Sequence, residues 1–284
     1  MISQKSFQNE KPTLYLVPTP IGNLDEMMPR AIEILKMVDI IAAEDTRVTI
    51  SLLKKFEINT RVIQHQTHNE IESSQGLINL LNKGYNIALV SDAGYPLISD
   101  PGQNIVELAV NNGFNVVPIS GCNAALNALV ASGLQVQPFT FVGFLSANKT
   151  ERIKELNFYK NFPTTLIFHE APHRIEKMLN DCFEVLGDRK ICLAREITKC
   201  HEEFIRGTLS EVIKHIDSLK GEMVVVIEGY REEKNVAIDM GNILNLVNKK
   251  IEEGFSKSEA IKDVAKFTGI SKNKIYDLVH SKKN

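Results

Sequence analysis

Short apolar runs alternate with amphipathic helical patterns along the first 120 residues, and this alternation limits the fold more than any other feature. Parallel strands must be joined by crossover connections, usually helices, so a regular strand–helix alternation predicts a parallel α/β sheet. We therefore predict a first α/β domain over residues 11–118. Its five expected strands are the apolar runs 13–17, 39–43, 62–66, 87–90 and 115–119.

A second α/β series is predicted over residues 119–230. Only three helical patterns separate its four apolar runs, and a Gly221-Glu222 turn precedes the last run. This arrangement favours a mixed sheet over an all-parallel one, because an antiparallel neighbour needs only a short turn. The expected strands are Phe139–Phe144, Thr165–Phe168, Ile191–Arg195 and Met223–Glu228.

The last part of the chain, residues 240–284, is predicted to be a helical domain that follows a charged linker. It contains three short helical patterns, and the turn at 268–271 is typical of a helix-turn-helix. Nine lysines against five acidic residues between 245 and 284 give this tail a charge of +4, although the whole chain carries −2. A basic tail favours contact with a polyanion. A solvated helical surface or a three-helix dimerisation module would show the same pattern.

Composition excludes several classes of protein. No apolar run approaches the roughly 20 residues that a membrane-spanning helix requires. The first ten residues are polar and have no signal-peptide core, so a cytoplasmic protein is expected. The four cysteines form no CxxC pair, which indicates neither a zinc site nor disulfides. No GxGxxG follows the first strand and no GxxxxGK(S/T) is present, so dinucleotide-binding and P-loop folds lack their phosphate loops.

The stretch from Ala88 to Gly102 gives the clearest sign of a ligand site. An apolar strand breaks into the acidic glycine loop 91–94, and a helix is expected to follow with Asp100 as its N-cap and Pro101 at its first position. This order is typical of a crevice at the carboxyl edge of a parallel sheet. Asp92 would favour a cationic or hydroxyl-bearing ligand, although capping of the turn is an equally good interpretation.

Two further charged motifs follow strand ends. The run 44–47, Glu-Asp-Thr-Arg, is expected at the carboxyl edge of the first sheet, where part of it would cap the next helix. Glu170 and Arg174 follow a strand of the second domain and are candidates either for function or for a structural ion pair. His169 and His173 lie on the two sides of a strand-to-helix break, so a metal-binding pair is not expected.

Six motifs that follow one another along the chain carry a family resemblance. They are Val17-Pro-Thr-Pro-Ile-Gly-Asn-Leu24, Ala42-Ala-Glu-Asp-Thr-Arg47, Ser91-Asp-Ala-Gly94 with Pro96 and Ser99-Asp-Pro-Gly102, Glu170-Ala-Pro-His-Arg174, Ala194-Arg-Glu-Ile-Thr-Lys199 and Gly221-Glu-Met-Val-Val-Val-Ile-Glu-Gly229. Together they resemble the ribosomal RNA small-subunit methyltransferase I family, the RNA-modifying branch of the tetrapyrrole methylase fold. The tail is similar to the helix-turn-helix appended in many members.

The resemblance implies two α/β domains of the tetrapyrrole methylase (class III methyltransferase) type, with S-adenosylmethionine in the cleft between them. It implies 2′-O-methylation of a cytidine ribose in small-subunit ribosomal RNA, free or in the assembled subunit, by a cytoplasmic homodimer without a metal. It places cofactor binding at Asp92, Ala93, Gly94, Ser120, Gly121 and Gly143. Ribose placement or proton acceptance would fall to Glu44, Arg47, Glu170 and Arg174, and phosphate contact to Lys149, Arg152, Lys272 and Lys274.

Two positions depart from the family pattern. Tyr95 stands where members usually have Thr, and Ser120-Gly121-Cys122 replaces Pro-Gly-Pro, although the glycine is kept. Two other functions fit parts of the sequence: a small-molecule tetrapyrrole methylase on the same fold, and a nucleic-acid-binding regulator whose body senses a ligand. The two charged motifs, 44–47 and 170–174, and the basic tail argue against the small-molecule methylase. The tail alone would permit the regulator, but a ligand sensor does not need six motifs of this type.

Overall fold

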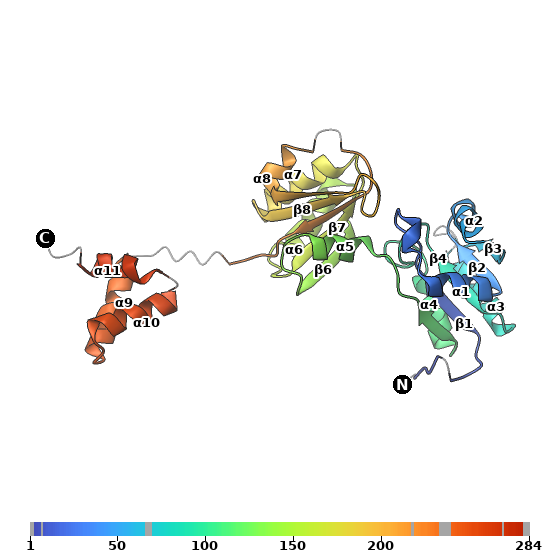
Figure 1. Cartoon of the computed structure of the whole chain (residues 1–284), viewed down its shortest axis with the longest axis horizontal. Coiled ribbons are helices and arrows are strands. Elements are labelled where there is room, and N and C mark those ends of the chain that lie inside the picture. Colours follow the sequence, from blue (N-terminus) through green and yellow to red (C-terminus); the bar gives the residue numbers. More distant parts are fainter. Residues whose placement is uncertain are drawn as a thin grey trace. The chain divides into compact units, whose positions relative to one another are not determined.

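The computed structural model describes residues 3–6, 8–65, 70–216, 219–232, 240–268 and 270–280 (Figure 1). The chain divides into two units, Met1–Tyr230 and Arg231–Asn284. The first unit contains two α/β domains, each built on one sheet, and the described part of the second unit is helical. The predicted fold class is therefore confirmed.

The first sheet is parallel throughout and has the strand order β3-β2-β4-β1-β5. Each strand lies within two residues of its predicted run, and Gln66, the last residue of the third run, lies outside the described residues. The strands are β1 (Thr13–Val17), β2 (Ile40–Ala43), β3 (Arg61–Gln64), β4 (Ile87–Val90) and β5 (Asn115–Pro118). The helices are η1 (Leu24–Glu26), α1 (Pro29–Met37), α2 (Thr46–Lys55), α3 (Glu70–Asn82) and α4 (Gln103–Asn111).

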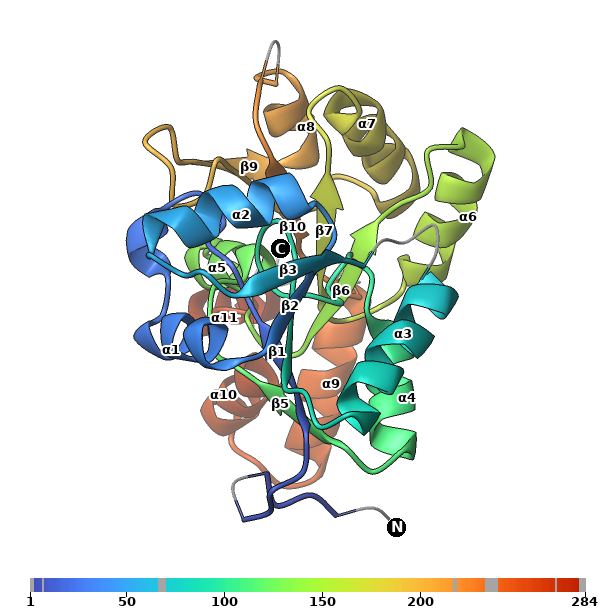
Figure 2. The ribbon, with the colours of Figure 1, turned by 90° about the vertical axis from the view of Figure 1, so that its right-hand side faces the viewer.

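Alternation along these strands divides their side chains between two cores. Val17 and Val90 pack with residues of α1 and α2, whereas Leu14 and Leu89 pack with residues of α3 and α4. Figure 2 shows the two pairs of helices on opposite sides of the sheet. Because both faces are covered, the strands appear in the sequence as continuous apolar runs.

The strand order brings three loops together at the carboxyl edge of the first sheet. β4 lies between β2 and β1 and is parallel to both, so the loops after these strands emerge side by side. Glu44 follows β2, Asp92 follows β4, and the loop 18–23 follows β1. A crevice at such an edge is the usual ligand site of an open α/β sheet.

The start of the helix after β4 was predicted wrongly by two residues. α4 begins at Gln103 with Gly102 as its N-cap, rather than after an Asp100 N-cap. The N–H groups of Gly102 and Asn104 donate to Oε1 of Glu70 at 3.0 and 3.2 Å, so a carboxylate from α3 satisfies the helix start. The Asp100 side chain is therefore not used as a cap.

The second sheet is mixed, as predicted, but it has five strands in the described part of the chain rather than four. In the order β6-β7-β10-β8-β9, β6 and β7 are parallel and all other neighbours are antiparallel. The strand that sequence analysis missed is β9 (Glu203–Thr208), an edge strand without a fully buried residue and therefore without an apolar run. The others are β6 (Phe139–Phe144), β7 (Thr165–Glu170), β8 (Lys190–Arg195) and β10 (Met223–Ile227).

Helices cover both faces of the second sheet as well. One core joins the sheet to α6 (Lys149–Tyr159), α7 (Ile175–Leu186) and α8 (Leu209–Ile213). The other core joins it to α5 (Ala124–Ala131) and also contains Ile21, from the loop after β1. This contact anchors the first domain's loop in the apolar interior of the second domain.

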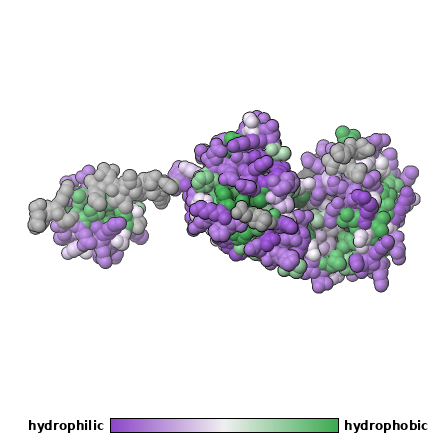
Figure 3. Space-filling view, turned by 90° about the horizontal axis from the view of Figure 1, so that it is seen from above, coloured by the Kyte–Doolittle hydropathy of each residue, from purple (hydrophilic) through white to green (hydrophobic). Residues whose placement is uncertain are grey.

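The second unit contains α9 (Met240–Glu252), α10 (Lys257–Thr268) and α11 (Lys272–His280), which share a small core around Val247, Ile261 and Ile275. The three helices agree with the predicted helical patterns, and Gly269 of the predicted turn lies outside the described residues. Lys272 and Lys274 are exposed on α11. The visible surface of each part is mainly hydrophilic, with apolar side chains exposed in places (Figure 3).

Candidate active site

Two loops at the carboxyl edge of the first sheet are joined backbone to backbone. Thr19 and Gly94 exchange both of their N–H···O=C bonds, at 2.9 and 3.0 Å. The Ser91 hydroxyl donates to the Gly94 carbonyl at 2.8 Å, and the Ser91 carbonyl accepts from the Thr19 hydroxyl at 3.0 Å. Gly94 has a φ of +80°, a conformation that favours glycine. The acidic loop is thus held in place by the protein itself.

Tyr95 fastens this loop to a third strand. Its hydroxyl donates to the carbonyl of Ile119, directly after β5, at 2.7 Å. A threonine side chain is too short to reach that carbonyl from the same backbone position. The departure from the family pattern therefore adds a support to the loop.

Gly121 is required by close packing between loops. A Cβ at this position would overlap Cγ of Pro18, so only glycine lets the loop after β5 meet the loop after β1. Ser120 and Gly121 support the loop region but do not line the cavity described next. Their direct contact with the cofactor stays a prediction.

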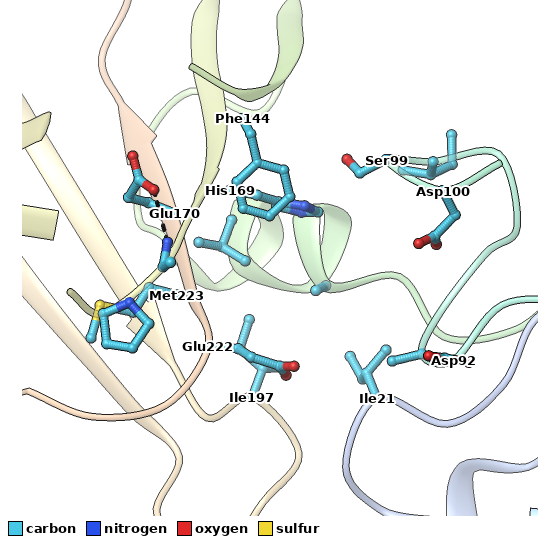
Figure 4. A pocket seen from close by; sticks show the side chains of 16 residues that line it. Ile21, Asp92, Ser99, Asp100, Phe144, His169, Glu170, Ile197, Glu222 and Met223 are labelled. Atoms are coloured by element: carbon cyan, nitrogen blue, oxygen red, sulfur yellow. Dashed lines mark hydrogen bonds between the residues drawn. The ribbon is translucent and has the colours of Figure 1, made fainter. Parts of the chain in front are cut away.

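A cavity of about 390 Å³ lies between the carboxyl edge of the first sheet and the ends of β7 and β10 (Figure 4). Its volume falls in the range of small-molecule sites. One wall consists of Ile21, residues 92–93 and residues 98–100, and the other includes Phe144, residues 169–172 and residues 222–224. The predicted cofactor residues Asp92 and Ala93 belong to this lining, while Gly94 and Gly143 are buried beside it.

The cavity is acidic on both sides. Asp92 and Asp100 lie on the first wall and Glu222 on the second, and the carboxylates of Asp100 and Glu222 are turned toward the space between them (Figure 4). Burial, followed by the charges of Glu44 and Asp92, raises the pKa of Asp100 to about 6. Such a wall attracts a positively charged ligand.

Glu170 and Arg174 form the ion pair that sequence analysis named as the structural alternative. Nε of Arg174 lies 3.1 Å from Oε1 of Glu170, and the guanidinium also donates to the Leu145 carbonyl at 2.6 Å. The Ala171 N–H donates to the same Oε1 at 2.9 Å. The other oxygen, Oε2, is buried and has no hydrogen-bond partner among the described residues. A buried acceptor of this kind is suited to a donor group of a ligand.

His169 lies in the same wall, edge-on to two aromatic rings of β6. Its ring centroid lies 5.1 Å from that of Phe141 and 5.5 Å from that of Phe144. Burial lowers its pKa, against an opposing effect of Glu222, so the imidazole is neutral near pH 7. Its Nε2 is buried and also lacks a partner within the described part of the chain.

Glu44 and Arg47 lie just outside the cavity lining. Burial, and to a lesser degree Asp92 and Asp45, raises the pKa of Glu44. Arg47 donates to both carboxylate oxygens of Asp45 at 3.0 and 2.6 Å, which lowers the pKa of Asp45 to about 2. The Arg47 side chain is nevertheless 89% exposed.

The predicted phosphate contacts of the second domain differ in accessibility. Lys149 is 68% exposed, with its Nζ 3.5 Å from Oδ1 of Asp181. The Arg152 side chain is only 6% exposed: its Nε donates to Oδ2 of Asp181 at 2.7 Å, and its Nη1 donates to the Ser146 and Ala147 carbonyls. Arg152 therefore holds the loop that leads into α6, and its guanidinium is not presented to a phosphate.

Several cavity residues were not named as site candidates by sequence analysis, among them Phe144, Asp100, His169 and Glu222. Asp100 was interpreted as a helix cap and His169 only as a possible metal ligand. Glu222 precedes β10, and the antiparallel pairing of Met223 with Glu170 brings it to the carboxyl end of β7. The predicted mixed sheet could have revealed Glu222. In an antiparallel pair one strand begins where its neighbour ends, so the residue before one strand lies beside the last residues of the other.

Among the described residues, no group of three or more His, Cys, Asp or Glu side chains is placed to hold a metal ion. Within the same part of the chain, no helix has the length and apolar character needed to cross a membrane.

Comparisons with known proteins agree with this architecture. The model of the family Tetrapyrrole (Corrin/Porphyrin) Methylases matches residues 13–213. Solved structures of a diphthine synthase and of the methyltransferase CobJ cover 76% and 77% of this chain, and 90% and 94% of their own, with TM-scores of 0.59 and 0.58. Their sequence identities of 14% and 16% support the fold alone. The fold and the interdomain cavity thus define a class III methyltransferase.

Closer relatives narrow the family. Two relatives carry the name ribosomal RNA small subunit methyltransferase I. The one from Bacillus subtilis (strain 168) is 48% identical to this chain, over 95% of this chain and 94% of the relative. The one from Halalkalibacterium halodurans is 44% identical, over 99% of both chains. The chain belongs to the ribosomal RNA small subunit methyltransferase I family of tetrapyrrole methylases. It is a methyltransferase, and its methyl donor is S-adenosylmethionine.

The cavity fits this donor, which carries a positive sulfur and a positive ammonium group. Asp92, Asp100 and Glu222 supply negative charge on both walls. The buried acceptor Oε2 of Glu170 and the unpartnered Nε2 of His169 are the kind of polar atoms that a ligand satisfies. Ala93 adds a small side chain that lets a ligand approach the backbone.

Proposed function

We propose that the chain methylates a ribose 2′-oxygen of a cytidine in small-subunit ribosomal RNA. The names of its relatives support the RNA substrate. The observation that carries the proposal is the acidic cavity between the two domains, because a cation-binding site at the carboxyl sheet edge is what the methyl donor requires.

Bound in this cavity, S-adenosylmethionine supplies a methyl group activated by its positive sulfur. The protein positions the reactants and excludes water, and one of its groups accepts the hydroxyl proton. Asp92 and Ala93 are proposed to hold the donor, because both line the cavity from a loop fixed by hydrogen bonds. Glu44 and Arg47 are proposed to place the ribose, since they flank Asp92 at the same sheet edge.

Exposed basic side chains are proposed to bind the RNA backbone. Lys149 lies in the first turn of α6, and Lys272 and Lys274 are exposed on α11. Contacts of this type bind phosphates regardless of sequence and make affinity fall as salt rises. Arg152 is left out because its guanidinium is buried against Asp181.

Methyl transfer from labelled S-adenosylmethionine to small ribosomal subunits, or to their free RNA, tests the proposal. We expect transfer by the wild type, its loss in Asp92→Ala, and wild-type transfer in Glu107→Ala, which removes an exposed carboxylate of α4. Mapping of the label by nucleotide would then test the cytidine 2′-oxygen. Cofactor binding without transfer to any ribosomal particle would contradict the proposal. Methylation of a porphyrinogen, or sequence-specific duplex DNA binding without turnover, would favour one of the two other functions.

We also propose that the protein acts as a homodimer in the cytoplasm. Support comes from apolar side chains that a monomer leaves exposed on α5, where Val130 is 72% and Leu126 45% exposed. Sedimentation of the wild type and of Val130→Glu tests this. A monomeric wild type would contradict the dimer, and an unchanged dimer in the variant would exclude this face.

A further inference from the structure

Asp100 projects into the cavity without a hydrogen-bond or ion-pair partner among the described residues. Its side chain lines the first wall and its carboxylate is turned toward the cavity space, across from His169 and Phe144 (Figure 4). No described residue donates a hydrogen bond to this carboxylate or forms an ion pair with it. Since a partly buried carboxylate is normally paired, the cavity contents are its natural partner.

The backbone around Asp100 is strained and clamped in this orientation. Leu97 and Ser99 have φ values of +74° and +69°, in the left-handed region that non-glycine residues rarely adopt. Such outliers persist only where the surrounding structure enforces them, and they cluster at functional sites. Here Glu70 holds the following turn through the Gly102 N–H, and a Cβ at Gly102 would lie only 2.8 Å from Leu89. The loop therefore aims Asp100 at the cavity instead of at the helix end.

Charges around Asp100 favour its protonated form. Glu44 and Asp92 lie on its own side, and together with burial they raise its pKa to about 6. Across the cavity stands a third carboxylate, that of Glu222, at the amino end of β10. An acceptor with a pKa just below the working pH is largely ionised before the reaction and still takes up a proton readily.

Unlike Asp100, both carboxylates of the opposite wall already have a basic side chain as a partner. The negative charge of Glu170 is already offset by Arg174 at 3.1 Å. Glu222 is 77% exposed, and its Oε2 lies 3.3 Å from Nζ of Lys199, so it already has both solvent and a basic side chain as partners.

Proton uptake would create a positive charge on His169, whereas it removes a negative charge from Asp100. Burial lowers the pKa of His169 and thereby disfavours the imidazolium that proton uptake would create. Protonation of Asp100, in contrast, removes a negative charge from a crowded acidic wall. The electrostatics of the cavity therefore favour the carboxylate as the final site of the proton.

We propose that Asp100 is the catalytic residue that accepts the proton of the attacking hydroxyl during methyl transfer, a role that rests on the function proposed above. The ribose 2′-oxygen forms the new bond to the methyl carbon, and the bond between that carbon and sulfur breaks with its electron pair remaining on the sulfur. The hydroxyl proton passes to an Oδ atom of Asp100. Nothing else is consumed, and the proton is later released to solvent.

The pH dependence of turnover tests this role. For the wild type, kcat measured with small ribosomal subunits should fall tenfold per pH unit below about pH 6. Asp100→Asn should lower kcat by about 100-fold or more, the range for loss of a general base, and should abolish that acidic limb. Its KM for small ribosomal subunits should stay within a few-fold of wild type. Glu222→Gln, which neutralises the opposite carboxylate, should retain the limb.

A second measurement does not depend on turnover. In protein labelled with 13C at aspartate carboxyls, one resonance should titrate near pH 6 and be missing in Asp100→Asn. Wild-type kcat in Asp100→Asn, or an acidic limb that persists in it, would overturn the role of Asp100. If the wild type transfers no methyl group to any ribosomal particle while the resonance titrates as expected, the proposed function has failed and not the assignment of the titrating group.

Discussion

Replacement of Asp100 by Asn is expected to stabilise the protein near neutral pH while it lowers turnover. The pKa of Asp100 is raised from 3.8 to about 6, so the folded protein binds a proton more tightly than the unfolded chain does. The stability linked to this proton is fully present below about pH 4 and is lost as the pH rises to about 6. At pH 7.5 the folded protein therefore carries an ionised carboxylate that its surroundings disfavour.

The size of this stabilisation follows from the pKa shift of Asp100. Two pKa units correspond to about 3 kcal/mol at most, at about 1.4 kcal/mol per unit. Asp100 is only partly buried, and solvent screening reduces this to about 1–2 kcal/mol. For a unit of this length that gain corresponds to a rise in Tm of about 3–6 °C.

Urea denaturation of the wild type and Asp100→Asn at pH 7.5 and pH 4.5 measures the effect. The variant should be more stable at pH 7.5, and most of its advantage should disappear at pH 4.5. Asp45→Asn is a control of opposite sign, because Arg47 lowers the pKa of Asp45 to about 2 and the control should be less stable at both pH values. An Asp100→Asn protein that is no more stable at pH 7.5, or equally stabilised at both, would refute the reasoning.

Three other changes test the structural roles described above. Arg152→Ala should lower the free energy of unfolding by about 3 kcal/mol in urea, because it removes the buried partner of the Asp181 carboxylate and leaves only the exposed Lys149 beside it; a loss of RNA affinity without loss of stability would contradict this role. Gly121→Ala should cost about 1–3 kcal/mol through overpacking against Pro18 and should weaken cofactor binding in calorimetry, and adding Pro18→Ala should recover part of both. Truncation before Met240 should weaken RNA binding and flatten its salt dependence without changing cofactor affinity; unchanged RNA binding would assign the tail another role.

The sequence predicts the first domain well because helices cover both faces of its sheet. A strand covered on both faces must be apolar at nearly every position, so its run is visible without knowledge of its neighbours. β9 shows the opposite case: it lies at the edge of the second sheet, and Phe204 and Ile205 are only half-buried. Its pairing with β8 is fixed by backbone hydrogen bonds, which leave no mark on composition.

The part of the candidate site that depends only on the order of the strands in the first sheet is predictable. Glu44 and Asp92 were expected at one sheet edge, and the position of β4 beside β2 brings them there. The opposite wall depends on tertiary pairing: Glu222 reaches the cavity only because β10 runs antiparallel to β7. Ion pairs cannot be predicted from the sequence either. Nothing in it distinguishes the buried Arg152 from the exposed Lys149 three residues before it.

The incorrect prediction of Asp100 as the N-cap of α4 is the most informative difference between the sequence analysis and the structure. Asp100 followed by Pro101 has the local chemistry of a helix start, and an isolated peptide would be expected to use it. The folded protein uses Glu70 from α3 for that purpose instead and holds Leu97 and Ser99 in an unfavourable backbone conformation. A structure that overrides a favourable local interaction and adds strain gives up stability at that point, and such conflicts concentrate where function requires them. The displaced carboxylate lies in the cavity, and that placement is itself an argument that its role is chemical.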